Sequence, residues 1–88
     1  LTAYFLDFAK TYNKNWDLIS MDKKTIFIEN SFSKNQGLKN TFIGIVIGLF
    51  TKEDQKFYLK NKSDVNKRII QMSKERVLSD YFSEEVDT

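Results

Sequence analysis

The sequence predicts an α+β fold of the order α-β-β-β-α, in which two helices pack on one face of a three-stranded antiparallel sheet. Three observations lead to this prediction. Apolar residues recur at helical spacing over residues 1–12, a period of two runs through the middle of the chain, and a charged segment with an apolar stripe follows over residues 63–82. Apolar spacing of three or four residues is typical of helices, and alternation is typical of strands.

The N-terminal segment predicts a short amphipathic helix. Its apolar side chains fall at three- and four-residue intervals, and they are Leu1, Phe5, Phe8 and Tyr12. Such a stripe buries one side of a helix and leaves the other in water. The following Asn-Lys-Asn cluster is typical of a turn, after which we expect Trp16 to anchor the chain to the core.

Three strand-like runs are predicted next. Residues 18–32 and 55–60 alternate apolar and polar side chains, and residues 41–50 are rich in isoleucine, valine and phenylalanine. β-Branched and aromatic residues favour strands. Residues 33–40 have loop composition and residues 52–54 a charged turn, so the runs predict an antiparallel meander.

The final helix is expected to begin at Ser63, because serine is a preferred N-cap and Asp64 suits the positive end of the helix dipole. Its apolar side carries Val65, Ile69 and Met72. The chain has no proline to break this helix. We therefore expect a single domain over residues 1–82 and a flexible acidic tail over residues 83–88.

Composition excludes several classes of function. The chain has no cysteine and no histidine, so it offers no disulfide, no thiolate zinc site and no imidazole for acid–base work. It has no glycine-rich phosphate loop, and we expect no enzyme activity of this domain, no cofactor and no metal. The longest apolar run covers residues 41–50, well short of the roughly 20 residues of a membrane span. We expect an intracellular protein, cytoplasmic or nuclear, that does not enter a membrane.

Charge is unevenly distributed along the chain. The formal net charge is +2, but residues 56–76 hold seven bases and two acids, whereas the last ten residues hold four acids and no base. A local excess of positive charge attracts polyanions.

The predicted layout resembles the double-stranded RNA-binding domain family. Leu1-Thr-Ala-Tyr-Phe-Leu-Asp-Phe-Ala-Lys10 is similar to the start of that family's first helix, and Phe42-Ile-Gly-Ile-Val-Ile47 to its central strand. Asn66-Lys-Arg-Ile-Ile70 and Glu75-Arg-Val-Leu78 are similar to the basic motif and the end of its last helix. The family's Gly-Pro-x-His turn is absent, and Asn66 and Ile70 stand where the basic motif has lysines.

This resemblance implies recognition of double-stranded RNA by shape, through its phosphates and 2′-hydroxyls. The chain would then be one domain of a larger RNA-processing protein. One such parent protein would be an enzyme similar to ribonuclease III. The first helix would contribute Thr2 and Lys10, and the loop after the first strand would contribute Lys34, Asn35, Gln36 and Lys39. The basic side chains around the start of the last helix would bind phosphates, and they are Lys60, Lys62, Lys67 and Arg68.

Two other interpretations compete with duplex-RNA binding. A protein-interaction or dimerisation module would use the exposed face of the sheet around Val46, where an apolar surface favours pairing with a partner protein or a second copy. A winged-helix DNA-binding fold would need a further helix before the strands, and residues 13–24 do not predict one.

Overall fold

The computed structural model describes the backbone of residues 2–87 and the side chains of residues 2–81. This part of the chain forms five α-helices and one short 3-10 helix, named in chain order α1 (Thr2–Tyr12), η1 (Trp16–Leu18), α2 (Met21–Lys34), α3 (Gln36–Ile47), α4 (Lys52–Lys60) and α5 (Lys62–Asp87).

The predicted α+β fold is wrong, because residues 2–87 contain no strand. The helices expected at the two ends of the chain are present as α1 and α5. The three segments expected to be strands form α2, α3 and α4 instead. The backbone of the expected acidic tail belongs to α5 up to Asp87, and the side chains from residue 82 onward lie outside the described residues.

Helix α2 forms because its ends are capped and its buried residues fall on one side. Ser20 is the N-cap, and its Oγ accepts a hydrogen bond of 3.2 Å from the Lys23 backbone N–H. Ile28 and Phe32, four residues apart, are buried. The run around Ile26 fits a strand equally well by local pattern, but burial at helical spacing decides the outcome.

Helix α3 begins at once after α2, with Asn35 serving both helices. The Asn35 backbone N–H donates to the Ser31 carbonyl at the end of α2, and its side-chain oxygen accepts a 2.9 Å hydrogen bond from the Leu38 N–H in α3. Leu38 and Phe42, again four residues apart, are buried. Their burial outweighs the strand preference of the isoleucines that follow, since β-propensity depends strongly on tertiary context.

Helix α4 begins with a capping box. The Thr51 Oγ1 accepts from the Asp54 N–H and the Thr51 N–H donates to Asp54 Oδ2, each over 3.1 Å. This reciprocal pair satisfies two backbone groups at a helix start. The segment expected to be a charged turn before a strand is therefore the first turn of a helix.

Helix α5 starts one residue before the predicted N-cap. The Asn61 carbonyl accepts the first hydrogen bond of the new helix from the Val65 N–H over 3.0 Å. Ser63 lies inside the first turn of α5, so its predicted role as the cap is wrong.

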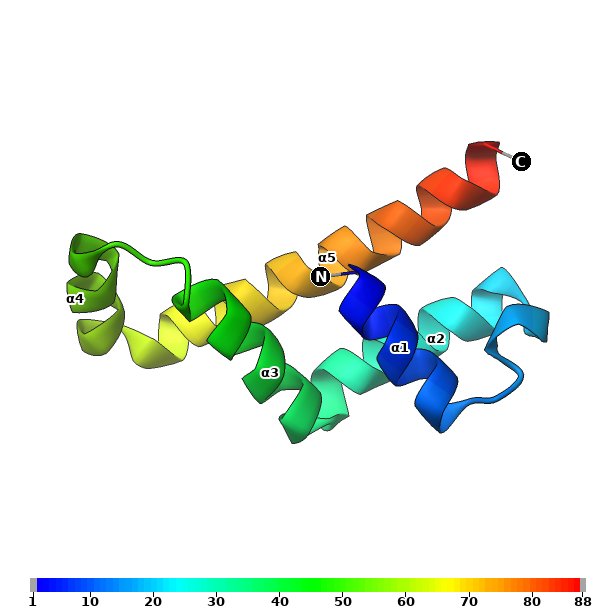
Figure 1. Cartoon of the computed structure of the whole chain (residues 1–88), viewed down its shortest axis with the longest axis horizontal. Coiled ribbons are helices and arrows are strands. Elements are labelled where there is room, and N and C mark those ends of the chain that lie inside the picture. Colours follow the sequence, from blue (N-terminus) through cyan, green and yellow to red (C-terminus); the bar gives the residue numbers. More distant parts are fainter. Residues whose placement is uncertain (1, 88) are drawn as a thin grey trace.

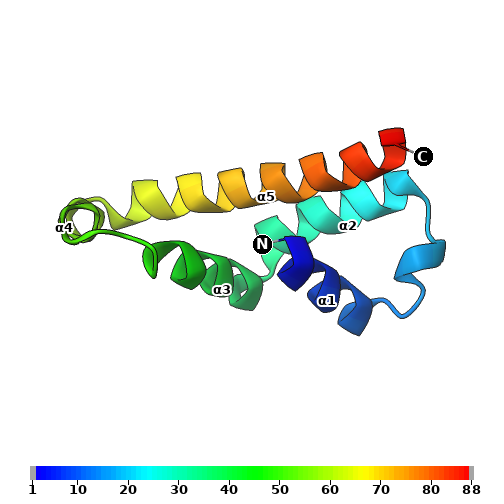
Figure 2. The same cartoon turned by 45° about the horizontal axis from the view of Figure 1, so that its top comes forward.

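The molecule is elongated and measures 44 × 26 × 17 Å, and α5 is its central helix. This helix packs against each of the other four α-helices. Figure 1 shows α4 at the end of the molecule where α5 begins, and α1 with the start of α2 toward the other end. Figure 2 shows α5 along one side, with α1, α2 and α3 on the other.

The hydrophobic core lies between the second half of α5 and the first three α-helices. It consists of Phe5, Ala9, Trp16, Ile28, Phe32, Leu38, Phe42, Val77 and Tyr81. Aromatic rings fill most of it. The Phe5 and Phe32 rings stack with centroids 5.6 Å apart, and the Trp16 and Tyr81 rings meet edge to face at 5.8 Å. Such pairs add stabilisation beyond their buried area. The predicted anchoring role of Trp16 is confirmed.

Candidate functional site

An apolar groove lies at the α4 end of the molecule, where α3, α4 and α5 meet. It has a volume of about 330 Å³. Its lining combines seven apolar or aromatic side chains with two charged ones, which are Val46, Phe50, Phe57, Tyr58, Val65, Ile69, Met72, Asp54 and Arg68. Grooves of this size lined mainly by apolar groups are typical of binding sites.

Two contacts hold α4 in place beside this groove. The Phe50 and Tyr58 rings meet edge to face, with centroids 6.0 Å apart. The Tyr58 hydroxyl donates a 2.9 Å hydrogen bond to the Asn66 side-chain oxygen on α5. The Tyr58–Asn66 hydrogen bond ties α4 to α5, whereas the capping box at Thr51 stabilises the start of α4 itself.

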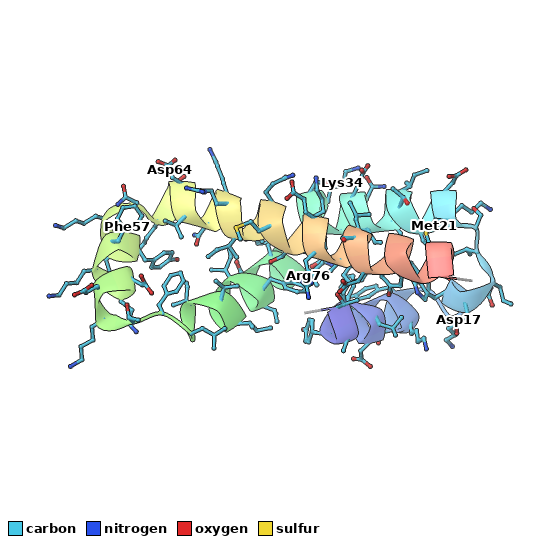
Figure 3. The ribbon with its side chains drawn as sticks, turned by 90° about the horizontal axis from the view of Figure 1, so that it is seen from above. Asp17, Met21, Lys34, Phe57, Asp64 and Arg76 are labelled. Atoms are coloured by element: carbon cyan, nitrogen blue, oxygen red, sulfur yellow. The ribbon has the colours of Figure 1, made fainter. Side chains whose placement is uncertain are left out.

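Helix α4 exposes apolar side chains and buries none of its residues. Phe57 is 63% exposed and Leu59 is 65% exposed, and Met72 on α5 is 64% exposed. Figure 3 shows Phe57 at the end of the molecule opposite Asp17. Phe57 and Met72 line the groove, whereas Leu59 does not. Single exposed apolar residues are ordinary, but exposed apolar residues that share one groove mark an interaction surface.

The surroundings of the groove are positively charged. Residues 52–68 contain six bases and three acids. None of the six bases forms an ion pair with another described side chain; within residues 2–81 the ion pairs are Lys10–Asp17 at 3.8 Å and Arg76–Asp80 at 3.5 Å. These cations are therefore available to an acidic partner.

The ten residues predicted to contact RNA lie in three separate places. The first is α1, where both predicted residues bind within the chain. The Thr2 hydroxyl donates a hydrogen bond to the Asp80 carboxylate on α5, and Lys10 pairs with Asp17. Neither side chain is presented as a free donor toward a ligand.

The second place is the corner between α2 and α3. Lys34, Asn35, Gln36 and Lys39 were expected on a loop, but Lys34 ends α2, Asn35 caps both helices, and the other two residues lie in α3. The Gln36 amide donates a 2.8 Å hydrogen bond to Asn40 Oδ1. The predicted loop is therefore wrong, although these side chains remain close together.

The third place is the junction of α4 and α5, which carries Lys60, Lys62, Lys67 and Arg68. Arg68 lines the apolar groove. Lys67 lines a second, polar groove of about 520 Å³ between α3 and α5, together with Gln36 and Lys39. The fold thus brings Gln36, Lys39 and Lys67 to one groove and Lys34 and Asn35 to a separate cleft, and neither place includes the other five predicted residues. Duplex-RNA binding by all ten stays a prediction.

Sequence reasoning missed the apolar groove because it assigned residues 55–60 to a strand of a sheet, whose apolar side chains would face the interior. The apolar surface expected around Val46 does not exist as a sheet face, yet Val46 itself lines the groove. One signal was present in the sequence, since Thr51 and Asp54 have the spacing of a capping box before a mostly charged segment.

The described residues offer neither a metal site nor a membrane-spanning helix. They contain no group of three or more acidic, histidine or cysteine side chains placed to hold a metal ion. None of the helices within residues 2–87 has both the length and the apolar character needed to cross a bilayer. Comparisons with family models, with curated proteins and with solved structures found no match.

Proposed function

We propose that this chain is a protein-interaction module whose apolar groove binds an amphipathic helix with acidic flanks from a partner protein. The observation that carries the proposal is the exposure of Phe57 and Met72 in the lining of one groove. Binding would remove these side chains from water, and burying a large apolar side chain contributes about 1.5–3 kcal/mol.

A helical segment suits the shape of the site. The groove runs between helices, so its walls are rows of side chains from α3, α4 and α5. An amphipathic helix places apolar side chains three and four residues apart along one side, and such anchors fill a groove between helices. The Phe57 and Met72 side chains would then contact the anchors.

The charge around the groove favours an acidic partner over a second copy of this chain. Six bases against three acids in residues 52–68 would be brought face to face if two copies met through this surface. Juxtaposed like charges disfavour association, whereas opposite charges speed and orient it. Arg68, the basic residue in the lining of the groove, would face an acidic flank.

The test uses a designed helical peptide of about 16 residues, with leucines at positions i, i+3, i+4 and i+7, alanines and glutamines between them, and glutamates at the two ends. A peptide of the same composition in scrambled order is the control. Amide chemical shifts of the labelled protein are followed during titration at about 50 and 200 mM salt. We expect shifts confined to residues 46–72, saturation in the micromolar range, and weaker binding at the higher salt.

Matched substitutions distinguish binding in the groove from nonspecific hydrophobic association. Phe57→Ala should weaken peptide binding about tenfold or more through lost buried area. Ile26→Ala removes an apolar side chain that is 59% exposed on α2, away from the groove, and should leave binding unchanged. Equal binding of the scrambled peptide, shifts elsewhere on the molecule, or a dimer formed through α4 would each overturn the proposal.

A further inference from the structure

A third cleft lies between α1 and the end of α2, away from the apolar groove. Its volume is about 310 Å³. Three aromatic rings, two amides, a serine and a lysine line it, and they are Phe8, Tyr12, Phe27, Asn30, Asn35, Ser31 and Lys34. The lining holds no carboxylate, which distinguishes it from the apolar groove with its Asp54.

The aromatic side of this cleft is a platform of three rings, Phe8, Tyr12 and Phe27, which pack against one another. The Phe8 ring lies 4.7 Å from the Tyr12 ring and 6.1 Å from the Phe27 ring, between centroids. Phe27 in turn meets Trp16 edge to face at 5.4 Å, so the platform is backed by the core. Tyr12 is 68% exposed and leaves part of its ring open to a ligand.

The other side of the cleft is polar and carries positive charge. Lys34 ends α2, is exposed, and forms no ion pair with any side chain of residues 2–81. The Asn35 side-chain oxygen is engaged by the Leu38 N–H, so its amide nitrogen is the group left to donate. Aromatic rings, amide groups and a lysine are thus gathered within one cleft.

We propose that this cleft binds a base of single-stranded nucleic acid. The base stacks on the Tyr12 ring, the Asn30 and Asn35 amides contact the base edge, and Lys34 binds an adjacent phosphate. Aromatic rings beside a positive charge are the usual means of binding single strands, because every base offers a face for stacking. A paired base is held within its duplex and cannot enter the cleft.

The corner between α2 and α3 extends this site toward a second phosphate contact. Lys34 and Asn35 line the aromatic cleft, and the next residue, Gln36, lines the polar groove together with Lys39. A nucleic-acid strand that leaves the cleft across this corner would meet Lys39. The proposal does not depend on the apolar groove, which lies at the α4 end of the molecule.

The test measures the anisotropy of a labelled uridine oligonucleotide of about ten residues at about 50 and 200 mM salt. Binding should be salt-sensitive, and the same sequence in a duplex should compete poorly. Tyr12→Ala should weaken binding about fivefold or more, whereas Tyr12→Phe, which keeps the ring, should bind like the parent chain. Lys34→Gln should weaken binding and reduce the slope of log K against log salt by about 0.7.

Controls identify the cleft and separate this proposal from peptide binding. Lys52→Gln removes an exposed lysine on α4 and should leave oligonucleotide affinity near that of the parent chain. Tyr12→Ala should not change binding of the acidic peptide. Circular dichroism confirms that each variant folds. Absence of binding at the lower salt, equal affinity for the duplex, or an unchanged affinity in folded Tyr12→Ala would overturn the proposal.

Discussion

The Tyr58 hydroxyl on α4 donates a hydrogen bond to the Asn66 side-chain oxygen on α5, with 2.9 Å between the two atoms. This bond joins two helices that share little buried surface, because α4 contains no buried residue. Tyr58 is only partly exposed, so its hydroxyl reaches α5 from a side chain that also packs on Phe50.

Removing this bond should loosen α4 while leaving the rest of the molecule intact. Tyr58→Phe keeps the ring but loses the hydroxyl, and a typical hydrogen bond contributes about 0.5–1.5 kcal/mol. Amide hydrogen exchange should become faster in residues 52–60 and stay unchanged in α2. Tyr4→Phe is the control, and comparable acceleration in both variants would contradict a specific role for the bond.

The capping box should matter to α4 in the same local way. Thr51→Ala removes the acceptor for the Asp54 N–H and should cost about 0.5–2 kcal/mol of helix stability. Thr11→Ala is a matched control, because the Thr11 hydroxyl only bonds back to the Asp7 carbonyl within α1. Exchange rates of the α4 amides distinguish the two variants. If Thr11→Ala accelerated exchange of the α4 amides more than Thr51→Ala did, the cap would not be what stabilises α4.

Substitutions of a buried and an exposed phenylalanine should differ sharply in their effect on the free energy of unfolding. Phe32 is buried in the aromatic core, and Phe32→Ala should cost about 3–5 kcal/mol, a large part of the stability of a small domain. Phe57→Ala should change the free energy of unfolding by about 0.5 kcal/mol or less, because that ring is mainly in solvent. Urea denaturation measures both. Similar losses for the two variants would mean that Phe57 belongs to the core.

Gly44 provides a direct test of helix against strand. A Cβ added there meets no atom within 4 Å, so Gly44→Ala adds helix propensity without a clash. We expect stabilisation of about 0.5–1 kcal/mol. Gly48 ends α3, where a Cβ would lie 3.4 Å from the Gly44 carbonyl, and the gain from Gly48→Ala should be smaller. Thermal unfolding of both variants measures the difference, and destabilisation by Gly44→Ala would contradict a helical α3.

The end helices were predictable from sequence, and the middle of the chain was not. In α1 the pattern is unambiguous, since Phe5 and Ala9 occur at helical spacing and no alternation competes with it. In α3 the isoleucines alternate like a strand, while the two buried anchors Leu38 and Phe42 lie at helical spacing. The local preference of the isoleucines favoured a strand, and tertiary burial of Leu38 and Phe42 selected a helix. The caps Ser20, Asn35 and Thr51 were the sequence signals that favoured helices.

The candidate sites were predictable only in part, for a related reason. Lys60, Lys62 and Lys67, which were expected to bind phosphates, are all exposed. Which of them share a groove depends on how the helices pack, and spacing along the chain does not contain that information. The exposure of Phe57 was hidden because an apolar residue in a regular pattern is normally assigned to the interior.

Helix α5 passes without a break from the α4 end of the molecule to the aromatic core. Its 26 residues extend over about 39 Å at 1.5 Å per residue, close to the full 44 Å length of the molecule. The helix would therefore fix the distance between the proposed peptide groove at α4 and the proposed nucleic-acid cleft at Tyr12. Two ligands held by one chain would be kept apart at a constant distance, as by a molecular spacer.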